Sequence, residues 1–224
     1  MKIITFTCDI YADAIPAYHY LWNKAWPDCP HEMIYVTNSK PLTVDATVHY
    51  LKGKDIEYGR RLRKFVSLHC DDNELGLFMM GDYFVKGLNI SLVEQARELC
   101  ERDQIAHCRL RPMPPPQGSA HRSLKVDDKL FGLVDKKRAY ALSLQPGIWR
   151  PKDLGKCVRD TWGPWACEVQ GSKNTKRVTG ALLSTRESAI THLNYYKKGK
   201  PIGVNWVMDN VPGEFWPRAA KGGE

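Results

Sequence analysis

Residues 75–84, LGLFMMGDYF, decide the fold class of this chain. An apolar run ends there at a single acid, Asp82, and two aromatic residues follow it. The run is far shorter than the ~20 apolar residues that cross a bilayer, so it predicts a buried strand. An acid at the carboxyl end of such a strand lies where open α/β sheets bind ligands, and one carboxylate there can hold a divalent cation against a phosphate. The same pattern also fits a strand that ends in an Asp-initiated turn.

Apolar runs and amphipathic segments alternate on both sides of this stretch. In the first half, strands are predicted at 2–8, 33–37, 44–51 and 105–110, and helices from Ala14, over 57–70 and after a Ser91–Glu94 capping box. This order predicts an α/β fold, with a mainly parallel central sheet flanked by helices.

The second half is less regular. We expect a proline-rich loop at 112–118, strands within 127–149 (including 139–145), a short helix from Pro151 and an irregular Trp-rich loop over 162–172. A helix capped by Ser184 and Glu187, a closing strand over 199–208 and a loose tail from Gly213 are predicted to follow.

Composition narrows the class of protein. The chain has 224 residues, 43% of them hydrophobic, which suits one large domain or two small ones. Its charge of +8 indicates an anionic partner. The seven cysteines include no CxxC pair, which argues against a disulfide framework or a zinc knuckle and favours a reducing compartment. No apolar stretch predicts a membrane span, and the N-terminal run meets Asp9 too early for a signal peptide, so a cytoplasmic location is expected.

Nine short segments, in this order, resemble small GT-A-type (family 2-like) glycosyltransferases of the bacterial and phage kind. They are TCDIYAD (7–13), LWNKAWPDCP (21–30), MIYVTN (33–38), RRLRKF (60–65), GDYF (81–84), CRLRP (108–112), SLQPGIWRP (143–151), PWACEVQGS (164–172) and YYKKGK (195–200). The resemblance implies a Rossmann-type GT-A-like single domain over 1–212. Its nucleotide-sugar half would cover about 1–111 and its acceptor half about 112–212, with a flexible tail over 213–224.

In the resembled family, an acidic motif after a central strand binds a metal that holds the donor diphosphate. GDYF is similar to that motif, so Asp82 would hold Mg²⁺ or Mn²⁺ and the diphosphate of a nucleotide-sugar donor such as a UDP-sugar. Met80 and Gly81 stand where a full Asp-x-Asp pattern would place its first acid. A metal-independent site that relies on Arg and Lys therefore stays open. The resemblance also implies that Arg61 assists the leaving diphosphate, although residues 60–64 equally fit a solvated basic helix face.

Two further groups of residues are candidates for the donor and the catalytic base. The loop after the first strand receives the nucleoside in this fold, which implies donor contacts from Thr7, Asp9 and Tyr11. The alternative is an ordinary strand-to-helix turn capped by Asp13. Glu168 is an isolated acid in an apolar, Trp-rich segment and suits proton abstraction from the acceptor, which presumes inversion at the sugar carbon. Alternatively, Glu168 pairs with a nearby cation.

The acceptor side is expected to use aromatic, amide and basic residues. Gln145, Trp149 and Trp165 are candidates for sugar or base contacts, although a buried Trp is as often a core residue. His192 is a further candidate metal ligand or a plain helical histidine. Residues 171–200 contain seven Lys or Arg against one acid, and residues 109–138 contain eight against three. Such blocks predict a polyanionic acceptor contacted by residues such as Lys173, Lys176 and Arg177.

Small phage glycosyltransferases that modify hydroxymethylated pyrimidines in DNA are one class with such an acceptor. The resemblance therefore favours DNA, with the base flipped out of the stack, in the cytoplasm of a bacterial host if the chain is phage-encoded. Transfer to a surface polysaccharide or a lipid-linked sugar is the competing enzymatic interpretation, and a non-catalytic nucleic-acid-binding protein is the alternative from another class. Oligomeric state is not predicted by these patterns.

Overall fold

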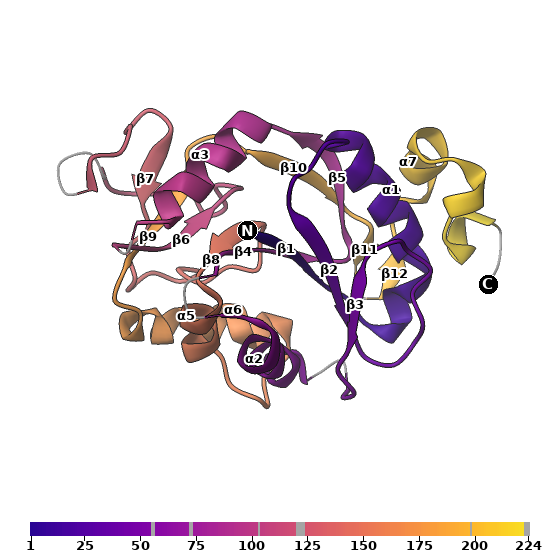
Figure 1. Ribbon diagram of the computed structural model, residues 1–224, viewed down its shortest axis with the longest axis horizontal. Helices are drawn as coiled ribbons and strands as arrows, with labels where there is room; N and C mark the ends of the chain where they lie inside the picture. Colours follow the sequence, from indigo (N-terminus) through magenta and orange to yellow (C-terminus); the bar gives the residue numbers. More distant parts are fainter. Residues whose placement is uncertain (55–56, 72–73, 103, 120–123, 198, 222–224) are drawn as a thin grey trace.

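A mixed eight-stranded sheet forms the centre of the computed structural model (Figure 1), which describes residues 1–54, 57–71, 74–102, 104–119, 124–197 and 199–221. The strand order is β3-β2-β1-β4-β8-β6-β9-β7. The strands are β1 (Lys2–Phe6), β2 (Glu32–Thr37), β3 (Thr47–Tyr50), β4 (Gly76–Met80), β6 (Ile105–Arg109), β7 (Phe131–Leu133), β8 (Gly147–Trp149) and β9 (Ala181–Thr185). The α/β class and the mainly parallel sheet predicted from the sequence are confirmed.

Strand β1 lies near the middle of the sheet and pairs in parallel with β2 and β4, so that Ile4 faces Ile34 on one side and Phe78 on the other. The first antiparallel strand is β8, between β4 and β6. A Cβ at Gly147 would lie 2.6 Å from the His107 ring, so only glycine fits where β8 passes β6.

Helices cover both faces of the sheet (Figure 1). One face carries α1 (Ile15–Ala25) and α3 (Ile90–Cys100), and the other carries α2 (Tyr58–His69), α5 (Pro151–Cys157) and α6 (Pro164–Asn174). Alternate residues of β1 therefore enter different cores: Ile3 packs with α1 and Ile4 with α2. Helix α5 begins at Pro151, as predicted. The expected Ser91–Glu94 capping box is wrong, because the Asn89 side chain accepts the Leu92 amide hydrogen bond at 3.1 Å.

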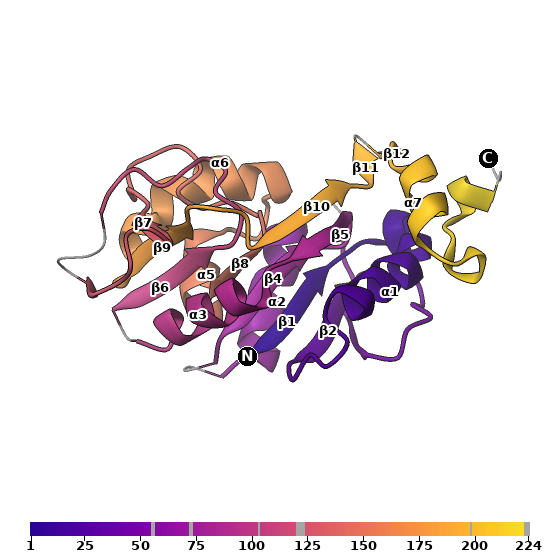
Figure 2. The same ribbon diagram turned by 90° about the horizontal axis from the view of Figure 1, so that it is seen from above.

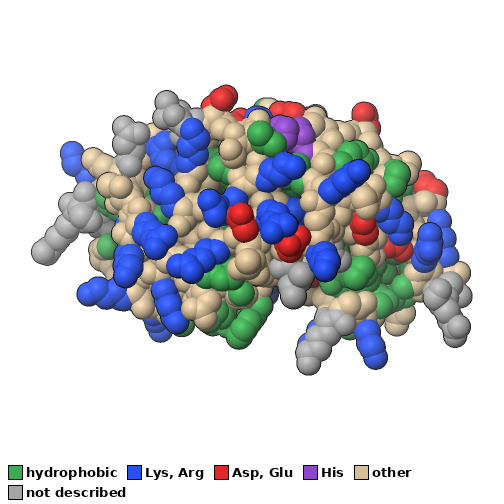
Figure 3. Space-filling model, turned by 90° about the horizontal axis from the view of Figure 1, so that it is seen from below, with side chains coloured by type: hydrophobic (Ala, Val, Ile, Leu, Met, Phe, Trp, Pro, Cys, Tyr) green, Lys and Arg blue, Asp and Glu red, His purple; other side chains and the backbone are tan. Residues whose placement is uncertain are grey.

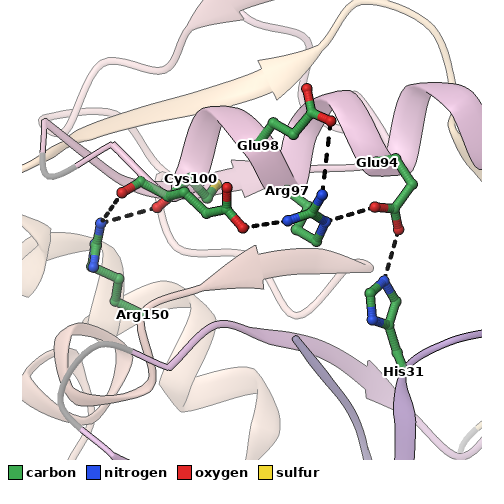
Figure 4. A network of polar contacts seen from close by, with 7 residues as sticks. His31, Glu94, Arg97, Glu98, Cys100 and Arg150 are labelled. Carbon is green, nitrogen blue, oxygen red and sulfur yellow. Dashed lines mark hydrogen bonds and ion pairs between the residues drawn. The ribbon is translucent and has the colours of Figure 1, made fainter.

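A polar network fastens α3 to its neighbours (Figure 4). His31, just before β2, lies 2.7 Å from a Glu94 carboxylate oxygen, and the other Glu94 oxygen accepts from Arg97 Nε at 2.6 Å. At the other end of α3, Arg150 Nη2 donates to the Cys100 carbonyl at 3.0 Å. These contacts connect α3 to the segments that precede β2 and follow β8.

Several predictions for the second half are wrong. Residues 162–172 are not an irregular loop, because Pro164 starts α6. Residues 184–196 form no helix: β9 ends at Thr185, and β10 (Ile190–Asn194) pairs antiparallel with β5 (Tyr83–Leu88). The expected strand over 199–208 is instead the end of a short ladder between β11 (Tyr196–Lys197) and β12 (Lys200–Pro201), followed by α7 (Val204–Asn210). Residues 139–145 contain no strand.

The described part of the C-terminal segment packs against α1 (Figure 2), so the prediction of a loose tail is wrong for residues 213–221. Phe215 stacks on Tyr20 with ring centroids 5.4 Å apart, and the Asp13 carboxylate accepts from the Arg218 amide at 3.0 Å. Residues 222–224 of the predicted tail lie outside the described residues.

Candidate active site

A pocket of about 620 Å³ opens at the carboxyl ends of β1 and β4. In an open α/β sheet, this edge is where ligands bind. The walls come from the segment after β1, the start of α2, the β4–β5 turn and the start of α6. The predicted site residues that line the pocket are Thr7, Tyr11, Arg61, Asp82 and Trp165. The fold thus brings together residues that are up to 158 positions apart in the sequence.

Asp82 occupies the turn between β4 and β5. Its carbonyl accepts from the Tyr195 amide at 2.7 Å, which fixes the turn against the segment after β10. Burial raises the pKa of the Asp82 carboxyl to about 6, against a smaller opposing effect from its own backbone amide. None of the ion pairs among the described residues includes this carboxylate. A half-buried charge without a counter-ion is costly, and a bound cation would remove that cost.

The residues around Asp82 fit a metal ion that is held by one carboxylate and, for the rest, by phosphate oxygens of the bound donor and by water. Of the described residues that line the pocket, Asp82 is the one acid, and the described chain contains no group of three His, Cys, Asp or Glu placed to ligate one ion. A preformed metal cage is therefore not present in the described part. A single carboxylate suits Mg²⁺ or Mn²⁺ when phosphate oxygens and water supply the other ligands.

Arg61 reaches from α2 to the end of β1. Its side chain is 3% exposed, and Nη1 donates to the Thr7 carbonyl at 2.6 Å. Its neighbours on the helix, Arg60, Arg63 and Lys64, are exposed. The alternative of a solvated basic face therefore holds for these three neighbours, whereas Arg61 is built into the wall of the pocket and places positive charge there.

The segment after β1 holds the other predicted donor residues. The Tyr11 ring stacks on Tyr196 with centroids 4.1 Å apart and also lines the pocket, which makes it a candidate contact for a nucleobase. Asp9 is not a lining residue of the pocket: its carboxylate accepts from the Ser39 amide at 2.9 Å, the Ser39 hydroxyl at 2.6 Å and the Lys40 amide at 2.8 Å. Burial acts to raise the pKa of Asp9, but these hydrogen bonds outweigh it and lower the pKa. Asp9 thus braces the loop between β2 and β3.

Glu168 lies one turn into α6, where Oε1 accepts from the Ser143 hydroxyl at 3.1 Å and the Leu144 amide at 2.7 Å. Its second carboxylate oxygen has no hydrogen-bond partner among the described residues. Burial raises the pKa of Tyr83, and the nearby charges of Asp82 and Glu168 raise it further. Both acids therefore lie close to the Tyr83 side chain.

Sequence reasoning named Gln145 and His192 but missed Tyr83 and Arg111, which form a cluster with them beside these acids. The Tyr83 ring stacks on His192 with centroids 4.2 Å apart, and Arg111 Nη1 lies 2.7 Å from His192 Nε2 and 3.3 Å from Gln145 Oε1. Burial and the Arg111 charge lower the pKa of His192 to about 3, so its neutral ring can accept from Arg111. His192 is on strand β10, not on a helix. The available signals were that Tyr83 follows Asp82 directly and that Arg111 follows a strand ending at the same sheet edge.

The remaining predicted acceptor residues lie elsewhere. Trp149 is 1% exposed and stacks on His107 with ring centroids 3.9 Å apart, so its prediction as an acceptor contact is wrong: it is a core residue. Lys173 and Lys176 line a separate hollow, and Arg177 lines another. Trp165, in contrast, is 70% exposed at the mouth of the main pocket.

No family model and no curated protein matches the chain, but solved structures do. The structure of S. aureus TarS 1-349 in complex with UDP-GlcNAc superimposes with a TM-score of 0.54 at 14% identity, covering 95% of this chain and 62% of that one. The same TarS segment with UDP gives 0.52 at 16% identity, covering 85% and 59%. The structure of an active-site mutant of LgtC gives 0.50 at 11% identity, covering 99% and 100%.

These likenesses establish the fold, a GT-A-like α/β fold that the chain shares with the TarS and LgtC structures. The chain spans about three fifths of the length of the TarS structures that it matches. Within the described residues, the helices lack the length and apolar character needed to cross a bilayer.

Proposed function

We propose that this protein is a glycosyltransferase that moves a sugar from a UDP-sugar to a hydroxyl group. The observation that carries the proposal is the pocket that gathers Asp82, Arg61 and Tyr11 at the carboxyl ends of β1 and β4. The fold shared with structures that contain UDP-GlcNAc and UDP supports a donor of this kind.

The pocket supplies what departure of the nucleoside diphosphate needs. The leaving group gains negative charge as the sugar–oxygen bond breaks, and positive charge held in place in a secluded site stabilises it. Arg61 provides one such charge, because its guanidinium is fixed by the Thr7 carbonyl. A divalent cation, when bound, would neutralise further charge on the diphosphate, and Asp82 would hold it. The uncapped N-terminus of α6, which also lines the pocket, adds a partial positive charge.

On the acceptor side, we propose Glu168 as the base. Oε1 is engaged by Ser143 and Leu144, which fixes the carboxylate, and Oε2, which makes no hydrogen bond to the described residues, is the oxygen that would take the proton. As the acceptor oxygen forms its bond to the sugar carbon, the hydroxyl proton passes to Glu168 and the bond to the diphosphate breaks on the other side, which inverts that carbon. Gln145, held by Arg111, is a candidate for orienting the acceptor.

We propose further that the acceptor is a hydroxymethylated pyrimidine in DNA. The net charge of +8 exceeds what one diphosphate needs, and the excess favours a polyanionic acceptor over a neutral glycan. The exposed Trp165 indole at the pocket mouth offers a stacking surface to a base that has left the duplex.

The test is a donor screen by mass spectrometry. The protein is incubated with each UDP-sugar and with hydroxymethylated DNA, unmodified DNA or a bacterial polysaccharide, each with Mn²⁺ and with a chelator. We expect a mass increase of one sugar on hydroxymethylated DNA alone. Transfer to the polysaccharide alone would refute the DNA acceptor. Absence of both UDP binding and UDP-sugar hydrolysis would refute the glycosyltransferase itself.

A further inference from the structure

A second hollow, away from the pocket, has more basic than neutral residues in its lining. It has a volume of about 400 Å³ and lies between the segment after β7 and the end of α6. Its charged lining residues are all basic: Lys136, Lys137, Arg138, Lys173 and Lys176. Within the described chain, no ion pair involves these five. The nearby acid Asp135 directs its carboxylate to the Lys137 backbone amide, from which it accepts at 2.9 Å. Five cations around one hollow repel one another, and an anion would relieve that repulsion.

A third hollow, of about 580 Å³, continues the basic surface toward the active site. Arg177 lines it and follows Lys176 directly, so the 3₁₀ turn η3 (Thr175–Arg177) contributes a basic residue to each of the two hollows. Arg159 also lines it, with its guanidinium 5.6 Å from the Trp162 ring centroid. At its far side Thr161 lines both this hollow and the active-site pocket.

The three hollows therefore form a series along α5, α6 and η3. Figure 3 shows this face of the molecule, where Lys and Arg side chains crowd the part under α5 and α6 and few acidic side chains interrupt them. We call the two basic hollows together the basic strip. The charged residues around Lys173, at the far end of the strip, are all basic, whereas the active-site pocket at the other end carries Asp82 and the exposed indole of Trp165.

We infer that the basic strip is the surface on which the DNA backbone lies while one nucleotide enters the active-site pocket. This inference rests on the proposed function for the identity of the acceptor. Eleven residues separate Trp165 from Lys176, which corresponds to about 16 Å along a helix. Phosphates of one strand follow one another every ~3.4 Å of duplex axis, so a duplex whose axis runs along this length presents about four or five of them per strand. Cations beside an aromatic platform are the combination that binds nucleic-acid strands.

The test reverses charge at the far end of the strip. Lys173→Glu with Lys176→Glu changes two exposed side chains that make no hydrogen bond among the described residues, so folding should be preserved. The matched control is Lys24→Glu with Lys129→Glu, which removes the same charge from exposed positions on the α1 and α3 face. Each protein is titrated against a fluorescent hydroxymethylated duplex at ~50 and ~200 mM salt, the range over which phosphate contacts dominate affinity, and against UDP by calorimetry.

The expected result is a shallower salt dependence for the strip variant alone. Losing two phosphate contacts lowers the slope of log affinity against log salt by about 1.8, so the affinity lost between the two salt concentrations shrinks by about 12-fold relative to wild type. UDP affinity should equal that of wild type. Equal slopes in wild type and strip variant, or the same change in the control, would overturn the inference. The inference would also be overturned if the two lysine substitutions weakened the binding of an acidic polysaccharide but left DNA binding unchanged. If neither wild type nor the variants bind UDP, the proposed function is refuted. The salt slopes of DNA binding then still decide whether DNA lies on the basic strip.

Discussion

Replacing Asp82 with Asn should make the ligand-free protein more stable and the enzyme inactive. Burial holds the folded-state pKa of Asp82 at about 6, above its ordinary value of 3.8, so ionising this carboxyl costs folding free energy. The sign follows from the direction of the change: the folded protein binds the proton more tightly than the unfolded chain, so stability is lost as pH rises from about 4 to about 6. Above about pH 6 the loss is complete and constant.

The magnitude follows from the same two values. The interval between 3.8 and about 6 corresponds to about 3 kcal/mol at pH 8 and to about 0.5 kcal/mol at pH 4. Asn keeps the shape but carries no charge, so Asp82→Asn should raise the unfolding free energy by about 2 to 3 kcal/mol more at pH 8 than at pH 4. Urea unfolding of both proteins at the two pH values measures this difference.

The stabilisation of the folded protein by bound UDP and Mn²⁺ provides the second half of the same test. A ligand at ~100 times its Kd stabilises the folded state by about 2.7 kcal/mol. UDP with Mn²⁺ should therefore stabilise wild type strongly at pH 8 and Asp82→Asn much less, which separates a lost cation ligand from a general change in stability. An effect of the substitution that is equal at both pH values would refute the reasoning about burial. Equal stabilisation of both proteins by UDP and Mn²⁺ would refute the assigned role of Asp82.

The other predictions concern the walls and mouth of the pocket. Glu168→Gln preserves the acceptor for the Ser143 and Leu144 hydrogen bonds, so it should abolish sugar transfer while UDP affinity stays at the wild-type value; normal turnover would remove Glu168 as the base. Arg61→Met leaves the Thr7 carbonyl without its charged donor, so we expect urea unfolding to show a loss of about 1.5 to 3 kcal/mol in unfolding free energy. Calorimetry should show weaker UDP binding by the same variant. Unchanged values for both would contradict the place of Arg61 in the pocket wall. Trp165→Ala alters a 70% exposed side chain and should change stability by less than about 0.5 kcal/mol while weakening DNA binding, and a large destabilisation would show that the indole is structural.

The sequence alone was sufficient for the α/β class, the strands β1, β2 and β4, and the position of Asp82 at a strand end. Each of these depends on local signals: a short run that is apolar throughout, and a turn residue directly after it. The same signals failed where two local patterns compete. Ser184 and Glu187 have the spacing of a capping box, but Thr185 belongs to β9, and Ile190 and His192 alternate as strand residues paired with β5.

Only the tertiary structure decided which residues form the site. Trp149 and Trp165 look alike in sequence, each within two residues of a proline and a glycine, but one fills the core against His107 and the other lies at the pocket mouth. In the sequence, Arg61 cannot be told apart from the three other cations of residues 60–64. Only the fold shows that its guanidinium lies against the end of β1. These assignments depend on long-range contacts, and a local sequence pattern carries no information on which strand end or helix start will lie opposite it in the fold.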